Sequence, residues 1–306
     1  MVYTVTLNPS LDYIVDVKDF KNGVVNRSCN EKINAGGKGL NVSFVLKNLG
    51  IESVALGFLA GFTGKEIERR LFEKGIGSDF VFLKEGFSRI NVKLRSGEET
   101  EINGQGPLVQ QEEVLSLEKK IDALREKDVL VLAGSIPSGL GQDFYGRLMK
   151  KVLDKDVMVV VDATKELLLE SLEHRPFLVK PNNFELGEVF GVDLKTGDDV
   201  VPYAKKLLEM GAKNVLVSLA AQGAVLLCED GKVYKSKAPE GKLVNSVGAG
   251  DSMVAGFIAG YLLNNDYEMA LKMGVCAGTA SACSSELATM EKVNEFLKQN
   301  LSLKNT

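Results

Sequence analysis

Histidine is almost absent from this chain of 306 residues, which contains only His174. Ser/His/Asp and Cys/His catalysis and histidine-rich metal centres each need an imidazole as base or ligand, so most of these chemistries are excluded. His174 lies in a polar stretch before a proline (ESLEHRP), which indicates a helix end. We therefore expect a solvated residue that matches the helix dipole, the alternative being a catalytic role.

The cysteines show no CxxC spacing. They lie far apart in the sequence, at Cys29, Cys228, Cys276 and Cys283. This scatter argues against a zinc site and against a disulfide framework. We expect all four to be small buried hydrophobic side chains.

Long apolar runs and an excess of positive charge are lacking as well. The longest uncharged apolar run covers only residues 253–263, whereas a membrane-spanning helix needs roughly 20 residues. The N-terminus (MVYTVTLN) has the pattern of a strand rather than of a signal peptide, so we expect a cytoplasmic protein with no membrane partner. Thirty-seven Lys and Arg against 41 Asp and Glu give a net charge of −4. This balance predicts no nucleic-acid partner, although it is compatible with a local basic pocket.

Short β-branched runs alternate with longer segments of helical period along the whole chain. This alternation is typical of βαβ units, so the predicted fold class is α/β with a mostly parallel sheet. The expected buried strands are residues 2–7, 53–59, 128–134, 157–163, 177–181 and 214–219. Four of them run into polar or glycine-containing turns (AGSIPSG, DATKE, KPNNFE and SLAAQG), which we expect to share one crevice at the carboxyl ends of the strands.

Two segments depart from this pattern and predict half-exposed strands. Residues 12–17 alternate between apolar and polar, and residues 89–104 read as a hairpin with Ser96 and Gly97 at its tip. They indicate a small separate sheet that serves as a lid or a subunit contact. A further hairpin is expected over residues 224–237, with its turn at Asp230 and Gly231.

A glycine-rich turn, NSVGAGDSM at residues 245–253, precedes the apolar helix pattern. Gly248, Ala249 and Gly250 bring almost no side chain to the expected helix N-terminus, where free N–H groups attract an anion such as a phosphate. Asp251 is placed beside them to accept a proton from an attacking hydroxyl. The alternative is an ordinary helix start in which Asp251 matches the dipole. The segment is neither a GxxxxGK[ST] P-loop nor a GxGxxG fingerprint.

A second glycine-rich turn, NAGGKGLNV at residues 34–42, also precedes a helical pattern. Gly36, Gly37 and Gly39 open space around Lys38 and Asn41, as expected for a bound sugar or polyol. The alternative is that the glycines are there for steric reasons alone.

Seven motifs of the chain occur in the order found in one enzyme family. They are TLNPSLD (6–12), NAGGKGLNV (34–42), SRINVKL (88–94), AGSIPSG (133–139), KPNNFEL (180–186), SLAAQGA (218–224) and SVGAGDSM (246–253). On these motifs the chain resembles the ribokinase-like carbohydrate kinases, in particular the 1-phosphofructokinase subgroup, with tagatose-6-phosphate kinases as near relatives. The resemblance implies a three-layer α/β fold in a single kinase domain over residues 1–306, with lid strands inserted at roughly 11–33 and 88–106.

The resemblance also implies roles for individual residues. It makes Asp251 the catalytic base, with Gly248, Ala249 and Gly250 as its anion hole. Sugar-binding positions, including the lid residues, are Asp12, Gly37, Lys38, Asn41, Arg89 and Asn103. Positions that line ATP are Lys180, Asn182, Ser218 and Gly223, and Asn182 with Glu185 forms the Asn-x-x-Glu pattern associated with Mg²⁺.

Three positions depart from the family pattern. Asn245 stands where many relatives have Asp, Ala220 where a second glycine is usual, and Lys165 where Arg is frequent. These departures leave open whether the protein uses a monovalent cation and how it contacts the nucleotide.

The resemblance and the residues together predict an ATP- and Mg²⁺-dependent kinase that converts D-fructose 1-phosphate to D-fructose 1,6-bisphosphate. An acceptor that already carries a phosphate needs fixed cations, and Arg89 offers a guanidinium, with Arg27 and Lys38 as further candidates. The alternative for Arg89 is an exposed strand charge. The alternative functions are a tagatose-6-phosphate kinase and a non-catalytic sugar-phosphate-binding protein. Because the lid strands leave one apolar face, we also expect a homodimer through the lid.

Overall fold

A ten-stranded sheet runs through the middle of the protein. The structure is a computed structural model that describes residues 1–302, and side chains are described for residues 1–300. Its strand order is β14-β13-β12-β11-β10-β9-β1-β4-β5, with β6 paired to β4. The strands are β1 (Val2–Thr6), β4 (Ser53–Ala60), β5 (Gly77–Ser78), β6 (Val81–Leu83), β9 (Val129–Ala133), β10 (Met158–Asp162), β11 (Leu178–Val179), β12 (Asn214–Ser218), β13 (Ala224–Cys228) and β14 (Val233–Ser236). All pairs are parallel except β12–β13 and β13–β14.

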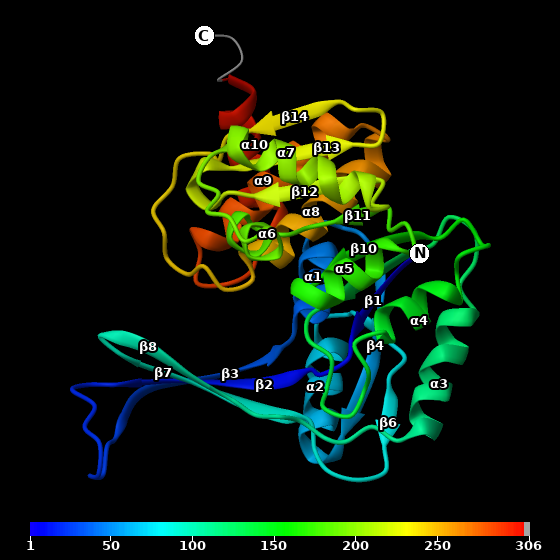
Figure 1. Cartoon of the computed structure of the whole chain (residues 1–306). Coiled ribbons are helices and arrows are strands. Elements are labelled where there is room, and N and C mark those ends of the chain that lie inside the picture. Colours follow the sequence, from blue (N-terminus) through cyan, green and yellow to red (C-terminus); the bar gives the residue numbers. More distant parts are fainter. Residues whose placement is uncertain (303–306) are drawn as a thin grey trace.

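Helices cover both faces of this sheet (Figure 1). One face carries α3 (Gln111–Asp122), α4 (Phe144–Lys150), α5 (Lys165–Leu172), α6 (Asn183–Phe190) and α7 (Gly197–Glu209). The other carries α1 (Lys38–Asn48), α2 (Gly61–Glu73), α8 (Ala249–Asn264), α9 (Tyr267–Ala282) and α10 (Met290–Ser302). The molecule therefore has three layers, and the predicted α/β class with a mostly parallel sheet is confirmed.

The central strands are apolar on both sides because each faces a helical layer. In β10, Val161 packs into the core below α3 to α7, and its neighbour Val160 packs into the core below α1 and α8 to α10. Successive side chains of a strand point to opposite faces, so a strand covered on both faces needs a continuous apolar run. This requirement explains why the buried strands were recognisable in the sequence.

A separate four-stranded sheet contains the strands predicted to form a lid, and it is called the lid sheet or lid below (Figure 1). Its order is β3-β2-β7-β8, formed by β2 (Ser10–Val17), β3 (Ser28–Gly36), β7 (Arg89–Ser96) and β8 (Glu98–Asn103). The β7–β8 hairpin turns at Gly97 and the β13–β14 hairpin at Asp230 and Gly231, as predicted. The strand β3 was not expected from its own residues, because it is almost wholly exposed and lacks apolar alternation.

Two expectations about single residues need correction. Cys228 and Cys276 are buried as predicted, but Cys283 is only half-buried. Cys29 is exposed on β3, because this strand lies at an edge of the thin lid sheet. His174 follows the end of α5 as predicted, but its side chain is only 10% exposed and lies 3.5 Å from Glu170. The packing of α5 against α4 covers this imidazole, so it is not a solvated residue.

The longest helices of residues 1–302 are α8 and α9, with 16 residues each. Within this part of the chain, no helix has both the length and the apolar character needed to cross a membrane.

Candidate active site

Polar residues gather at the edge where the parallel strands end. Asp162 is the last residue of β10, Lys180 follows β11, and Ser218 ends β12. The helices α1 and α8 begin nearby, so that Lys38 contacts Asp162 and Asn41 contacts Asp251. The fold therefore brings together motifs from residues 34 to 253, at the position where open α/β sheets bind their ligands.

Asp251 lies in the first turn of α8 and is 6% exposed. Its Oδ2 atom accepts a hydrogen bond from the Asn41 side-chain amide at 2.8 Å. Burial and the negative charge of Asp162 raise the pKa of Asp251 to about 6, against the smaller opposing effects of Asn41, Lys38 and Lys180. The carboxylate is thus ionised at neutral pH and more basic than an exposed aspartate.

Asp162 was not among the predicted site residues, although it lies at the centre of this arrangement. It is 1% exposed, and its Oδ1 atom lies 3.1 Å from Lys38 Nζ and 3.4 Å from Lys180 Nζ. Burial would raise the pKa of Asp162, but the two lysines hold it below its ordinary value. The available signal was a lone carboxylate at the end of a buried apolar run (VMVVVDA).

Lys38 is charged for a matching reason. Burial alone would lower the pKa of Lys38, but the carboxylates of Asp162, Asp251 and Glu185 raise it above its ordinary value. The ammonium of Lys180 lies 3.3 Å from where a Cβ on Gly250 would be, and therefore sits against the N-terminus of α8. Free N–H groups at a helix start and two ammonium groups form a strongly anion-binding environment.

Glycines bring the base of the lid close to the start of α1. A Cβ on Gly36 would lie 2.5 Å from a carboxylate oxygen of Asp12. Gly37 has a φ of 131°, and a Cβ there would lie 2.6 Å from the Thr6 side chain. A side chain at either position would overlap these neighbours, so glycine is required for steric reasons. The same glycines also let Asp12 lie close to the start of α1. Asp12 also accepts a hydrogen bond from Asn91 at 2.9 Å.

One face of the lid sheet is polar. Strand register places Asn34, Asp12, Asn91 and Asn103 side by side across the four strands. Two residues further along β7, Lys93 is buried, 3.7 Å from Asp12. Asn103 is exposed at the end of β8.

The two predicted arginines occupy different ends of the lid. Arg89 begins β7, is half-buried, and donates from Nε to the Asn8 carbonyl at 2.9 Å. Burial lowers the pKa of Arg89, and no carboxylate of the described residues forms an ion pair with it. Arg27 is exposed just before β3, beside the far end of β2. With a rise of about 3.3 Å per residue, the length of β2 separates it from the base of the lid.

The motifs predicted to line a nucleotide lie at the ends of β11 and β12. Asn182 and Ser218 form an isolated parallel bridge. Asn182 is also the N-cap of α6, and its side chain and that of Glu185 form a reciprocal capping box, each accepting a backbone N–H at 2.8 Å. The Asn-x-x-Glu pattern therefore has a structural role, because it caps the N-terminus of α6.

The turn after β12 contains the residue that replaces the usual glycine. Ala220 adopts a left-handed conformation (φ 48°), and Gly223 has a φ of 97°, with the Ser236 carbonyl 2.0 Å from where a Cβ would be. A residue other than glycine in this region costs about 1–2 kcal/mol, so Ala220 is more strained than a glycine would be. Lys165, at the start of α5, is exposed and lies 3.6 Å from Glu188.

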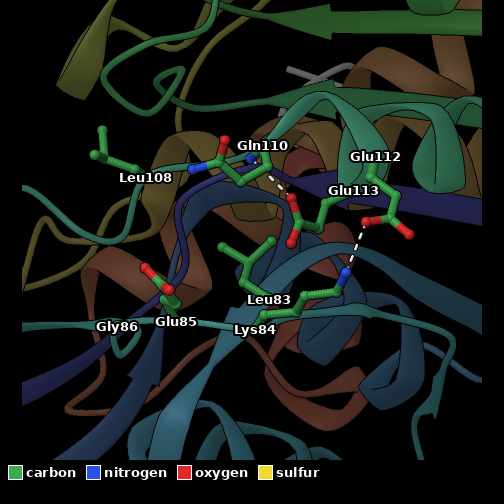
Figure 2. A pocket seen from close by; sticks show the side chains of 8 residues that line it. All are labelled: Leu83, Lys84, Glu85, Gly86, Leu108, Gln110, Glu112 and Glu113. Carbon is green, nitrogen blue, oxygen red and sulfur yellow. Dashed lines mark hydrogen bonds and ion pairs between the residues drawn. The ribbon is translucent and has the colours of Figure 1, made fainter.

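A cavity beside the base of the lid does not coincide with this site. Figure 2 shows it between the segment after β6 and the start of α3, with Lys84 and Glu112 joined by an ion pair of 2.7 Å. Its lining includes none of the predicted site residues. The predicted site residues therefore lie at the open edge of the sheet and not around this cavity.

Known proteins match this chain along almost all of its length. Residues 5–293 match the pfkB family of carbohydrate kinases, and the chain belongs to this family. It is 48% identical over 299 residues to a 1-phosphofructokinase of Bacillus subtilis, with 98% of each chain covered. It is 35% identical over 300 residues to a D-tagatose-1-phosphate kinase of Bacillus licheniformis, again with 98% of each covered.

A solved structure supports the same assignment. Phosphofructokinase-2 from Escherichia coli, in complex with substrates and products, superposes with a TM-score of 0.91 at 27% identity, over 98% of this chain and 99% of that one. The predicted family and its three-layer fold are therefore confirmed. The protein is an enzyme, a carbohydrate kinase.

Proposed function

We propose that this kinase transfers the γ-phosphoryl group of ATP to D-fructose 1-phosphate, giving D-fructose 1,6-bisphosphate and ADP. The observation that carries the proposal is Asp251, a buried carboxylate of raised pKa at the glycine-rich start of α8. The name of the Bacillus subtilis relative supports the choice of substrate.

In the proposed mechanism Asp251 is the general base. It takes the proton of the acceptor's 6-hydroxyl while that oxygen bonds to the γ-phosphorus and the bond to the ADP oxygen breaks. The N–H groups of the turn formed by Gly248, Ala249 and Gly250 hold the transferring phosphoryl group. The hydrogen bond from Asn41 orients the carboxylate toward the hydroxyl.

The sugar phosphate is proposed to lie between the lid and the start of α1. Asp12 accepts hydrogen bonds from the hydroxyl groups of the sugar, and the two terminal NH2 groups of the Arg89 guanidinium bind the phosphate of the sugar. The full proposed set is Asp12, Arg27, Gly37, Lys38, Asn41, Arg89 and Asn103. Of these residues, Arg27 lies beside the far end of β2, away from the base of the lid in the same chain.

The nucleotide is proposed to lie along the ends of β11 and β12, against Lys180, Asn182, Ser218 and Gly223. On this arrangement the chain acts as one kinase domain over residues 1–306, into which the lid strands are inserted.

A second candidate substrate is D-tagatose 1-phosphate, because a relative at 35% identity is named for it. We expect a coupled ADP-release assay to give the highest kcat/KM for fructose 1-phosphate, compared with fructose 6-phosphate, the 1- and 6-phosphates of tagatose, and free fructose. A higher value for either tagatose phosphate would reassign the substrate. No turnover with any of them would refute the sugar-phosphate assignment.

Magnesium is proposed to accompany ATP, with Asn182 and Glu185 as its protein contacts. Among the described residues no three His, Cys, Asp or Glu side chains cluster as a metal site. Mg²⁺ usually keeps several waters and binds through one or two carboxylates plus substrate phosphates, so a single carboxylate such as that of Glu185 fits such a role. When bound, the ion neutralises charge on the polyphosphate.

Glu185→Gln is expected to raise the Mg²⁺ concentration needed for half-maximal rate by roughly 10- to 100-fold, as loss of a contact through water does. Glutamine still forms a capping box, so α6 is retained. The matched control is Glu113→Gln, which makes the same change in the capping box of a different helix, at the start of α3 and outside the candidate site. An unchanged Mg²⁺ dependence would remove Glu185 from metal binding.

We propose a homodimer joined through the lid, because the polar face of the lid sheet is buried whereas its apolar face is exposed to solvent in a single chain. Its polar face buries Asn91 and Lys93, whereas on the other face Ile33 is 42% and Ile102 63% exposed. These two isoleucines lie in one row of the sheet, with Tyr13 and Val92 between them. An exposed apolar sheet face of this kind marks an interaction surface.

Light scattering of the purified protein at micromolar concentration should therefore give the mass of a dimer. Ile102→Lys is expected to yield a monomer, whereas Val233→Lys, at an exposed apolar residue of β14, should leave the dimer intact. A monomeric wild-type protein would contradict the proposal.

A further inference from the structure

Asp162 joins the two lysines of the candidate site through a single oxygen. Lys38 comes from the start of α1 and Lys180 from the segment after β11, and both ammonium groups approach Oδ1. The other oxygen, Oδ2, is buried with no hydrogen-bond partner among the described residues. A buried carboxylate with one unsatisfied oxygen is costly, so a purely structural explanation accounts poorly for its geometry.

The charges around Asp251 come from three other parts of the chain. Asp162 acts from β10, Lys38 from α1 beside the Asn41 amide, and Lys180 from the segment that leads to α6. Glu185 on α6 adds a negative charge that acts on Lys38. Asp251 is therefore faced by two cations and by the buried charge of Asp162.

We propose that Asp162 is a positioning residue that holds Lys38 and Lys180 at the phosphoryl-binding turn and offsets their positive charge beside Asp251. The inference rests on the proposed role of Asp251 as general base. Neither the Asn41 contact nor the glycines of the turn could supply this effect, because none of them carries a charge.

The physical need for such a residue follows from two conflicting demands. Phosphate groups require fixed cations, but two nearby cations make a carboxylate a weaker base. A general base works best when its pKa lies near the operating pH. A buried negative charge that touches both cations reconciles the demands, since it fixes their positions and offsets their effect on Asp251.

The test is the pH dependence of kcat/KM in Asp162→Asn. We expect its acidic limb to move to lower pH by about one unit or more, since a like charge is lost and two cations remain. The KM for ATP should rise as well, because the lysines lose their common anchor. The charge-matched control is Asp154→Asn, at an exposed residue before β10, which should behave as wild type. An acidic limb at the wild-type pH in Asp162→Asn would overturn the proposal.

A second pair of variants keeps the test decisive if Asp162→Asn folds poorly. Lys180→Met should move the acidic limb to higher pH, and Asp162→Asn/Lys180→Met, which preserves the net charge of the cluster, should bring it back toward the wild-type position. Equal profiles for these two variants would refute the role of Asp162. A normal turnover of Asp251→Asn would instead refute the proposed base, so the two failures are distinguishable.

Discussion

Asp251→Asn is expected to lower kcat by about 10²- to 10⁴-fold, the usual contribution of a general base. Asparagine has the shape of aspartate and still offers an oxygen to the Asn41 amide, so the start of α8 should persist. Binding of sugar phosphate and ATP should therefore be retained. Steady-state kinetics and equilibrium binding measured on the same preparation would separate the two effects.

The pH dependence gives an independent check on the same residue. Because the pKa of Asp251 is raised to about 6, the wild-type kcat/KM should fall as the pH drops through 6 and the base becomes protonated. This limb should be missing from the residual activity of Asp251→Asn. The exposed Asp154→Asn variant serves as control and should keep both the rate and the limb. Near-normal turnover of Asp251→Asn would exclude Asp251 from the mechanism.

Arg89→Met is expected to raise the KM for fructose 1-phosphate by roughly 10- to 100-fold, since a hydrogen bond to a charged group contributes about 1.5–3 kcal/mol. The guanidinium is half-buried at the base of the lid and its Nε is held by the Asn8 carbonyl. It is therefore oriented before substrate arrives, and no ion pair with a described carboxylate has to be broken. Arg89→Lys should recover only part of the loss, because an ammonium cannot bind phosphate in a bidentate way.

The matched control for this prediction lies on the same strand. Arg95, near the tip of the lid, pairs with Glu99, and Arg95→Met should leave the KM unchanged. The KM for ATP should also be unaffected in Arg89→Met. If the variant weakens the use of free fructose as much as that of fructose 1-phosphate, Arg89 does not bind the phosphate.

The layers of the fold were predictable because their strands carry local signals. The run VMVVVDA is apolar without alternation, since β10 is covered by helices on both faces. The glycine-rich turns at residues 34–42 and 245–253 were equally visible, because a helix start that approaches other groups closely excludes larger side chains. The exposed strand β3 gave no such signal and was missed as a separate strand.

The partners of the charged residues were decided by the tertiary structure alone. Asp162 stands 124 positions from Lys38, and only the parallel register of β10 with its neighbours brings its carboxylate between two lysines. The sequence pattern Asn-x-x-Glu likewise could not reveal that Asn182 and Glu185 cap α6 through each other. Coulombic effects depend on distance and burial in space, and spacing along the chain measures neither.

Local sequence thus determined which segments become strands, helices and glycine-rich turns, because hydrophobic periodicity and steric demand act within a few residues. Tertiary structure determined which face of the lid is polar, where Arg27 lies relative to the base of the lid, and why the pKa of Asp251 is raised. These properties come from groups that meet only after the chain has folded, since burial removes water from Asp251 and the fold sets Asp162 beside it.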